Sequence, residues 1–246
     1  MGYQDASGRR LSYGSYLHLS ELLGLQGGLT EAHDELLFIV VHQVYELWFK
    51  VLIHELEAVR AAIETDDLHA ARHFLSRVKV IEALLVEQVG VLETMAPQDF
   101  LTFRSELAPA SGFQSAQFRE IEFLSGLKDP GYIKALESDA DGRARLQQRL
   151  AEPSLLDVFT RLLDRRSVTV SDLYRQGNQQ PDLLELAEAL LDHDEGFRLW
   201  RLRHVEMVER QIGDKPGTGG STGVRYLQST LGKRFFPELW EVRSQL

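Results

Sequence analysis

Apolar residues recur along most of the chain with the three- and four-residue spacing of an amphipathic α-helix. They keep this spacing for more than six turns within residues 34–65. The pattern resumes over residues 68–95, and Thr65, Asp66 and Asp67 before it supply the side chains that can cap the new helix. Because only a few residues separate the two segments, we expect two long helices packed as an antiparallel pair.

The same spacing predicts further helices at residues 97–107, 114–126, 130–137, 142–151, 154–165, 182–212 and 224–231. No alternating strand pattern bounded by hairpin signals occurs, and no internal repeat or long linker divides the chain. The expected fold class is therefore all-α: a helical bundle with long antiparallel helices, formed by residues 1–246 as a single domain.

Composition and charge exclude several classes of protein. The chain has 246 residues, which is long enough for one large domain with its own core. It has no cysteine, which excludes disulfide frameworks, thiolate nucleophiles, cysteine-held metals and a thiolate-ligated haem. Its 37 acidic and 27 basic side chains give a formal charge of −10, so nucleic acid is not expected as a partner.

No segment shows the pattern of a targeting signal or a membrane anchor. Residues 1–10 are polar and lack an apolar stretch. The longest strongly apolar run, residues 36–41, is far shorter than the ~20 apolar residues that a spanning helix needs. We therefore expect a cytoplasmic protein without a membrane partner.

Histidine is the natural place to look for chemistry, because it titrates near neutral pH and binds metals. His69 and His73 have a zinc-compatible spacing, but no third ligand stands near them. Six of the eight histidines are expected on the surface or at a helix end: His18, His33, His54, His69, His73 and His193.

His42 and His204 differ from the others because each stands inside an apolar helical stretch, where an unpaired imidazole costs free energy. His42 shares a helix face with Phe38, four residues earlier, and His204 shares one with Trp200. A neutral histidine on an apolar helix, in a chain without cysteine, is typical of an axial haem ligand. A core histidine with a structural partner is the alternative.

Two further features suggest recognition of a polar group. The segment Gly217–Gly223 is rich in glycine but follows a helix and lacks the lysine of a phosphate loop. We interpret it as a flexible loop that brings hydroxyls such as that of Thr218 over a ligand. Arg104 shares a helix face with Phe100, where a guanidinium suits capture of a carboxylate, although an exposed helix arginine is the simpler reading.

Eight short motifs occur in a specific order: Tyr13-Gly-Ser-Tyr16, His33-Asp-Glu35, Phe38-Ile-Val-Val-His42-Gln-Val-Tyr-Glu-Leu-Trp-Phe-Lys50, Leu92-Glu-Thr-Met95, Phe103-Arg104, Ser111-Gly-Phe-Gln-Ser115, Trp200-Arg-Leu-Arg-His204 and Gly217-Thr-Gly-Gly-Ser221. Together they resemble the tryptophan 2,3-dioxygenase family, from about residue 11 to residue 239. A series of matches in order is far more specific than any one of them.

The resemblance implies an all-helical oxygenase that uses haem b with ferrous iron. It implies cleavage of the indole C2–C3 bond of L-tryptophan by O2 to give N-formylkynurenine. It also implies a homotetramer, in which Tyr13 and Tyr16 of an N-terminal segment, residues 1–20, reach the site of a neighbouring subunit.

By the same resemblance, the cofactor is held by His204 as the axial iron ligand, with Trp200, Gly217 and Gly219 beside it. His42 is the catalytic residue that accepts a hydrogen bond from the indole N–H.

Four more positions resemble substrate-binding residues of the family. Phe38 packs against the indole ring, and Arg104, with Phe100 beside it, holds the carboxylate. Thr218 contacts the ammonium or carboxylate when the glycine loop closes.

One departure from the family concerns residues 165–195, a segment that is shorter than in typical members. This difference concerns access to the cavity, so it leaves the identity of the substrate undetermined. A related haem monooxygenase that inserts one oxygen atom into tryptophan or a substituted tryptophan, giving a 2-oxindole-type product, is therefore an alternative. From other classes, a non-catalytic haem-binding sensor and a purely structural bundle are also alternatives.

Overall fold

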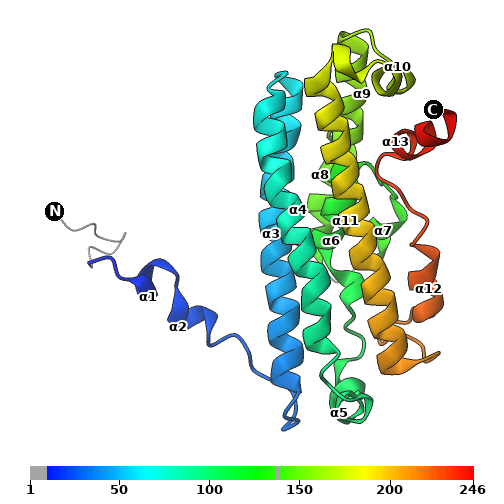
Figure 1. The fold of residues 1–246 in the computed structure, drawn as a ribbon. Coiled ribbons are helices and arrows are strands. Elements are labelled where there is room, and N and C mark those ends of the chain that lie inside the picture. Colours follow the sequence, from blue (N-terminus) through cyan, green and yellow to red (C-terminus); the bar gives the residue numbers. More distant parts are fainter. Residues whose placement is uncertain (1–9, 137–138) are drawn as a thin grey trace.

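The computed structural model describes residues 10–136 and 139–246, and no β-strand occurs among them. Three long helices form the frame: α3 (Glu35–Glu64), α4 (Leu68–Leu92) and α11 (Pro181–Ile212). They run side by side along the bundle, and α4 packs against both of the others (Figure 1). The all-α prediction is confirmed.

Shorter helices complete the bundle. Both α6 (Ala116–Ser125) and α9 (Leu155–Arg165) pack against α3, and α8 (Ala140–Ala151) packs against α6. The remaining elements are α1 (Tyr13–Tyr16), α2 (Leu19–Leu22), α5 (Pro97–Phe103), η1 (Arg104–Leu107), η2 (Gly112–Gln114), α7 (Gly131–Ala135), α10 (Val170–Arg175), η3 (Gly177–Gln179), α12 (Val224–Ser229), α13 (Pro237–Glu241) and η4 (Val242–Gln245).

Local signals explain where the long helices begin. The Asp67 side chain accepts a hydrogen bond from the Ala70 N–H at 3.0 Å and caps α4, while Pro97 occupies the first turn of α5. The predicted helix 97–107 is divided, because the chain tightens into the 3₁₀ turn η1 after Phe103. The end of the predicted helix 130–137 lies outside the described residues.

The sequence reading missed α1, α2, α10 and α13, which are at most six residues long. Elements of this length have too few turns to show a helical period. Capping chemistry was the available signal for two of them. The Ser12 side chain accepts a hydrogen bond from the Ser15 N–H at 3.2 Å at the start of α1, and the Thr169 side chain accepts one from the Asp172 N–H at 3.1 Å at the start of α10.

Among the described residues, α3 is the one helix that is long and apolar enough to cross a membrane by length and composition. The expectation that its apolar stretch is too short was therefore wrong, because it counted only residues 36–41. In the bundle α3 packs against α4, α6 and α9 and fully buries Leu52, Leu56 and Val59. One face of α3 therefore belongs to the core, while Leu36 and Leu47 on the same helix are exposed.

His193 was predicted to be a surface residue, and this prediction was wrong. It lies on α11, is 2% exposed, and forms hydrogen bonds with two other helices. Its Nδ1 lies 2.7 Å from Oε1 of Glu82 on α4, and its Nε2 lies 2.9 Å from Oγ of Ser125 on α6. Burial raises the pKa of Glu82 above its usual range. The sequence shows only the polar neighbours of His193, not the partners that folding brings to it.

A second buried acid on α11, Asp194, holds the C-terminal segment. Its Oδ2 accepts hydrogen bonds from the N–H groups of Phe235 and Phe236 at 2.9 and 3.0 Å, and from Nε1 of Trp240 at 2.9 Å. Asp194 has no exposed surface, so these donors replace the water that it loses on folding.

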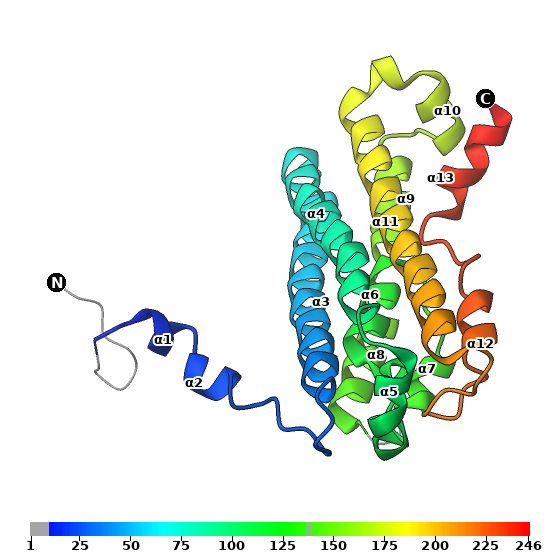
Figure 2. The ribbon, with the colours of Figure 1, turned by 60° about the horizontal axis from the view of Figure 1, so that its bottom comes forward.

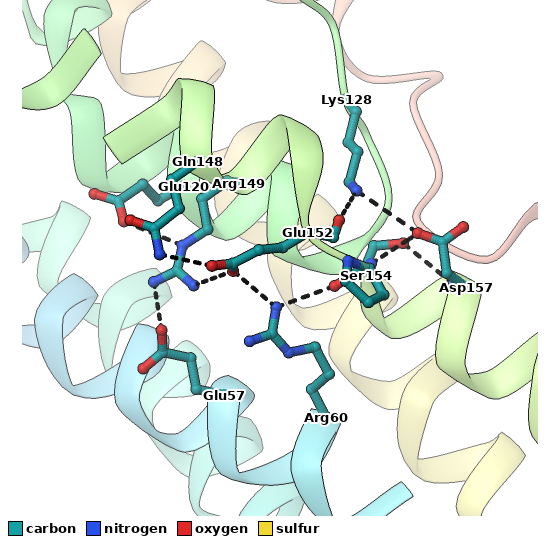
Figure 3. A network of polar contacts seen from close by, with 10 residues as sticks. Glu57, Arg60, Glu120, Lys128, Gln148, Arg149, Glu152, Ser154 and Asp157 are labelled. Carbon is teal, nitrogen blue, oxygen red and sulfur yellow. Dashed lines mark hydrogen bonds and ion pairs between the residues drawn. The ribbon is translucent and has the colours of Figure 1, made fainter. Parts of the chain in front are cut away.

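An ion-pair network joins α3, α6 and α8 (Figure 3). Arg149 on α8 contacts Glu57 of α3 at 2.5 Å, Glu120 of α6 at 3.4 Å and Glu152 at 3.1 Å. Burial by itself raises the pKa of Glu152, but hydrogen bonds and the charges of Arg149 and Arg60 hold that pKa below its usual value. Arg149 is therefore the cation that several carboxylates share.

Replacing Arg149 by methionine (Arg149→Met) is expected to lower the free energy of unfolding by about 1–3 kcal/mol at pH 7, since it leaves partly buried carboxylates unpaired. Because the folded-state pKa of Glu152 is depressed, the loss should shrink as the pH falls below the usual value of 4.5 and through that pKa. Urea unfolding at several pH values measures both effects. Arg143→Met, on the same helix, is the control, and an equal loss there would contradict the network's role.

Candidate functional site

A cavity lies between the N-terminal half of α3 and the C-terminal half of α11, and residues of α5, η1, η2 and the glycine loop also line it. Of the eleven site residues expected from the sequence, eight line this cavity: Phe38, His42, Phe100, Arg104, Trp200, His204, Gly217 and Thr218. Two of the three exceptions, Tyr13 and Tyr16, lie in the N-terminal arm, and the third, Gly219, is an exposed residue of the glycine loop.

His42 faces the cavity from α3 with one ring nitrogen already engaged. Its Nδ1 lies 2.7 Å from the carbonyl oxygen of Phe38. A carbonyl only accepts, so Nδ1 carries the proton and Nε2 keeps a free lone pair. Burial lowers the pKa of His42, more than the Phe38 carbonyl and the charge of Glu46 raise it. The imidazole is therefore neutral at pH 7 and can accept a hydrogen bond.

An aromatic wall stands next to this acceptor. The Phe38 ring lies 4.1 Å from the imidazole of His42 and stacks on Phe100 at 5.6 Å. Phe103 meets both phenylalanine rings edge-on, at 5.6 Å from Phe38 and 5.4 Å from Phe100. The wall offers a flat apolar ligand aromatic contact beside a nitrogen acceptor.

His204 faces the same cavity from α11. Its ring stacks on that of Trp200 with centroids 5.1 Å apart and planes within 10°. Burial and the neighbouring His42 lower the pKa of His204 to about 4, so this imidazole is also neutral. Trp200 is itself wedged against Tyr45 and Phe118, at 6.0 and 5.2 Å. These contacts fix the plane in which His204 presents its ring.

The donor set suits a haem better than a bare metal ion. Within residues 10–136 and 139–246, no group of three His, Asp or Glu side chains could hold a metal ion. The cavity instead offers one neutral imidazole, His204, among apolar walls, which fits a macrocycle that brings its own equatorial ligands. Four cavity-lining residues carry a buried polar atom without a partner: Arg119 and Arg201 at Nε, Trp200 at Nε1 and Gln211 at Oε1. Unpaired polar atoms of this kind are expected where a ligand belongs.

Two hydrogen bonds hold the glycine loop and Pro216 before it at the edge of the cavity. Nη2 of Arg104 donates to the carbonyl of Pro216 at 2.5 Å, and Oγ1 of Thr218 donates to the carbonyl of Ala110 at 2.6 Å. A Cβ on Gly219 would lie 2.6 Å from Cβ of Ser111, so this glycine allows the loop to approach. Gly219 therefore packs the loop in place and does not line the cavity.

A buried charged cluster on the cavity wall was missed by the sequence reading. The carboxylate of Glu122 pairs with Arg119 and with Arg201, each at 2.7 Å, and all three side chains are at most 5% exposed. The guanidinium of Arg119 also lies 3.8 Å from the ring centre of Tyr132. Spacing along a helix indicates a surface pair for Arg119 and Glu122. The available signal was Arg201, which lies inside the motif that carries His204.

The N-terminal arm stands away from this site. Tyr13 and Tyr16 are 78% and 69% exposed, and both views show α1 and α2 extending from the bundle (Figures 1 and 2). Within one chain, these two tyrosines do not reach the cavity.

Comparison with known proteins agrees with this geometry. A family model described as tryptophan 2,3-dioxygenase matches residues 1–171 and 165–246. A tryptophan 2,3-dioxygenase of Nocardioides sp. (strain ATCC BAA-499 / JS614) is 49% identical, over 97% of this chain and 96% of the relative. Enzymes of the same name from Anaeromyxobacter dehalogenans and Serratia proteamaculans are 46% and 42% identical, over 98% and 97% of this chain and 98% and 94% of their own lengths.

The two matched stretches overlap at residues 165–171, at the start of the segment that was expected to be shorter than in typical members. The three relatives are covered over at least 94% of their lengths, and the shorter segment at residues 165–195 stays a prediction. The chain belongs to the tryptophan 2,3-dioxygenase family and is an oxidoreductase.

Proposed function

We propose that this chain is a haem b-dependent dioxygenase that cleaves the indole C2–C3 bond of L-tryptophan with O2 and yields N-formylkynurenine. The observation that carries the proposal is the pair of neutral histidines, His42 and His204, that face one cavity from two helices. The printed names of relatives at 42–49% identity support it.

His204 is the residue proposed to hold the haem iron, and the stacked ring of Trp200 orients it. Gly217 lines the same cavity and would lie beside the cofactor. A bound haem would supply the iron chemistry that activates O2. The 246 residues act as one domain around this cofactor.

The protein's own residues bind and orient the substrate. The indole ring lies against the wall of Phe38 and Phe100, and its N–H donates to the free Nε2 of His42. The amino-acid end is a zwitterion, so it needs a cation for its carboxylate and a hydroxyl or carbonyl for its ammonium. Arg104 exchanges the Pro216 carbonyl for the carboxylate, and Thr218 offers its hydroxyl.

Closing the mouth has a chemical purpose. When Arg104 and Thr218 bind the two ends of the zwitterion, the substrate holds the glycine loop against the cavity, which excludes water from the reacting atoms. Both oxygen atoms of O2 remain in N-formylkynurenine, so the overall reaction consumes no external electrons.

We also propose that the enzyme works as a homotetramer in the cytoplasm. An arm with exposed aromatic side chains, Tyr13 and Tyr16, favours packing on another chain. Exposed apolar residues on α3, such as Leu36 and Leu47, offer a surface for such contacts.

The His204→Ala variant is expected to lose tight haem binding, because no cysteine can replace the ligand. Haem content per chain, measured as the pyridine haemochrome, checks this. The His54→Ala variant removes an exposed histidine of α3 and should keep one haem per chain. A His204→Ala protein with normal content and an unchanged histidine-type spectrum would refute the assignment.

The Arg104→Met variant should lower kcat/KM for L-tryptophan by about 10–150-fold, the loss expected for a charge-assisted hydrogen bond. Haem content should not change. Arg104→Lys keeps the charge without the bidentate fork, so its kcat/KM should lie between those of the wild type and of Arg104→Met. The substrate control is tryptamine, which lacks the carboxylate. If wild-type enzyme used tryptamine as well as tryptophan, Arg104 would have no such role.

The reaction itself is tested by incubating the reduced haem enzyme with L-tryptophan under ¹⁸O2 and limiting reductant. Mass spectrometry should find both labelled atoms in N-formylkynurenine, because ring cleavage keeps both. A product with one labelled atom, formed in proportion to the reductant consumed, would identify a monooxygenase instead.

The assembly is tested by removing residues 1–20. The shortened chain should stay folded by circular dichroism but lose most activity, and light scattering should show four chains per particle for the full-length protein. A fully active monomer would contradict the proposed role of the arm.

A further inference from the structure

Glu46 stands in the wall between the proposed active-site cavity and a polar groove on the outside of the bundle. It follows His42 by four residues on α3, so both side chains lie on one helix face. Glu46 and Ser115 line both the cavity and the groove, which also contains Lys50 and Gln117. Glu122, the other carboxylate of the cavity wall, pairs with Arg119 and Arg201, whereas no arginine pairs with Glu46 within the described residues, and the proposed mechanism does not use Glu46.

A hydrogen-bonded amide holds this carboxylate in place. Nε2 of Gln117, on α6, donates to Oε2 of Glu46 at 2.8 Å and to the backbone carbonyl of Glu46 at 2.9 Å. The double contact fixes the side chain and the local backbone of α3 to the same amide. Glu46 therefore remains one helical turn from His42.

Glu46 forms no ion pair with the basic side chains that the structure describes, although Lys50 lines the same groove. The charged or titratable groups that line the cavity and groove around it, element by element, are Lys50 and Tyr45 on α3, Arg104 on η1, Arg119, Glu120 and Glu122 on α6, Asp139, Arg145 and Arg149 at α8, Arg201 and His204 on α11, and Tyr226 on α12.

Most of these groups are already balanced or uncharged. Glu120 pairs with Arg145 and Arg149, and Glu122 pairs with Arg119 and Arg201. His204 is neutral at pH 7, since its pKa is about 4. The negative charge nearest to His42 along its own helix face is therefore that of Glu46, and it favours a proton on the imidazole.

This effect opposes the consequence of burial. Loss of water makes the His42 imidazole a weaker base and hence a weaker hydrogen-bond acceptor, and a fixed carboxylate nearby restores part of its proton affinity. We propose that Glu46, held by Gln117, is a positioning residue that strengthens the hydrogen bond from the substrate's indole N–H to His42 and so favours ligands that carry this N–H. The inference rests on the proposed function, in which His42 accepts that hydrogen bond.

The first test measures the binding of L-tryptophan to the haem-loaded protein by calorimetry between about pH 4.5 and 8. Protonation of His42 removes the acceptor, so affinity falls on the acid side. Glu46 favours the protonated form and places this fall at higher pH in the wild type. The fall should move down by roughly half a pH unit in Glu46→Gln and roughly one in Glu46→Lys, as expected for a charge about 6 Å away. Glu64→Gln, exposed on the same helix, should not move it.

The second test compares L-tryptophan with 1-methyltryptophan, which has no indole N–H. The preference of the wild type for tryptophan, as a ratio of Kd values, should fall roughly two- to five-fold in Glu46→Gln, because only the N–H ligand uses the weakened acceptor. Gln117→Met removes the tether at nearly constant volume and should change the ratio in the same direction by less. Circular dichroism and haem content establish that each variant is folded.

The possible results separate the inference from the function on which it rests. The inference is wrong, and Glu46 has only a structural role, under either of two results. One is that Glu46→Gln and Glu46→Lys do not lower the pH at which affinity for L-tryptophan falls. The other is that they weaken the binding of both ligands equally. A His42→Ala variant that keeps the full preference for tryptophan would instead refute the proposed role of His42. If His42→Ala loses the preference for tryptophan while the Glu46 variants bind both ligands as the wild type does at every pH, only the inference about Glu46 is wrong.

Discussion

Keeping two imidazoles uncharged inside an apolar bundle is the constraint on which the site depends. His42 and His204 both lose water when α3 and α11 come together, and burial lowers the pKa of each. A protonated imidazole carries a proton on both ring nitrogens, so it has no lone pair with which to bind iron or to accept a hydrogen bond. The aromatic walls that create this environment are therefore part of the chemistry as well as of the packing.

The site also requires α3 and α11 to keep a fixed register, and buried polar contacts supply it. Apolar packing alone tolerates small slides of one helix along another, whereas a hydrogen bond between buried groups does not. His193 ties α11 to Glu82 of α4 and to Ser125 of α6. Because His193 lies about three turns before His204 on the same helix, these contacts constrain where the second imidazole enters the cavity.

The sequence was most informative where function and helical period coincide. The spacing of Phe38 and His42 placed both on one face of a long helix, and the structure brings their rings within 4.1 Å. Trp200 and His204 were paired by the same reasoning, and their rings stack. Such contacts lie within one helix, so they follow from the period alone.

Contacts between distant segments could not be read in this way. The partners of His193 lie 111 and 68 residues away, and nothing in its local sequence names them. Glu122 was unremarkable in the sequence for the same reason, since its partner Arg201 is 79 residues away. The contact of Gly219 with Ser111 likewise depends on how a loop closes onto another, which no helical pattern encodes.

The buried carboxylate of Asp194 has a consequence for the order in which the chain can fold. Its three donors come from Phe235, Phe236 and Trp240, 41, 42 and 46 residues further along the chain. Until that segment lies against α11, the carboxylate lacks these donors, and burying it carries a large desolvation cost. The middle of α11 therefore reaches its final packing together with residues 235–240, and a change that detaches this segment destabilises the helix as well.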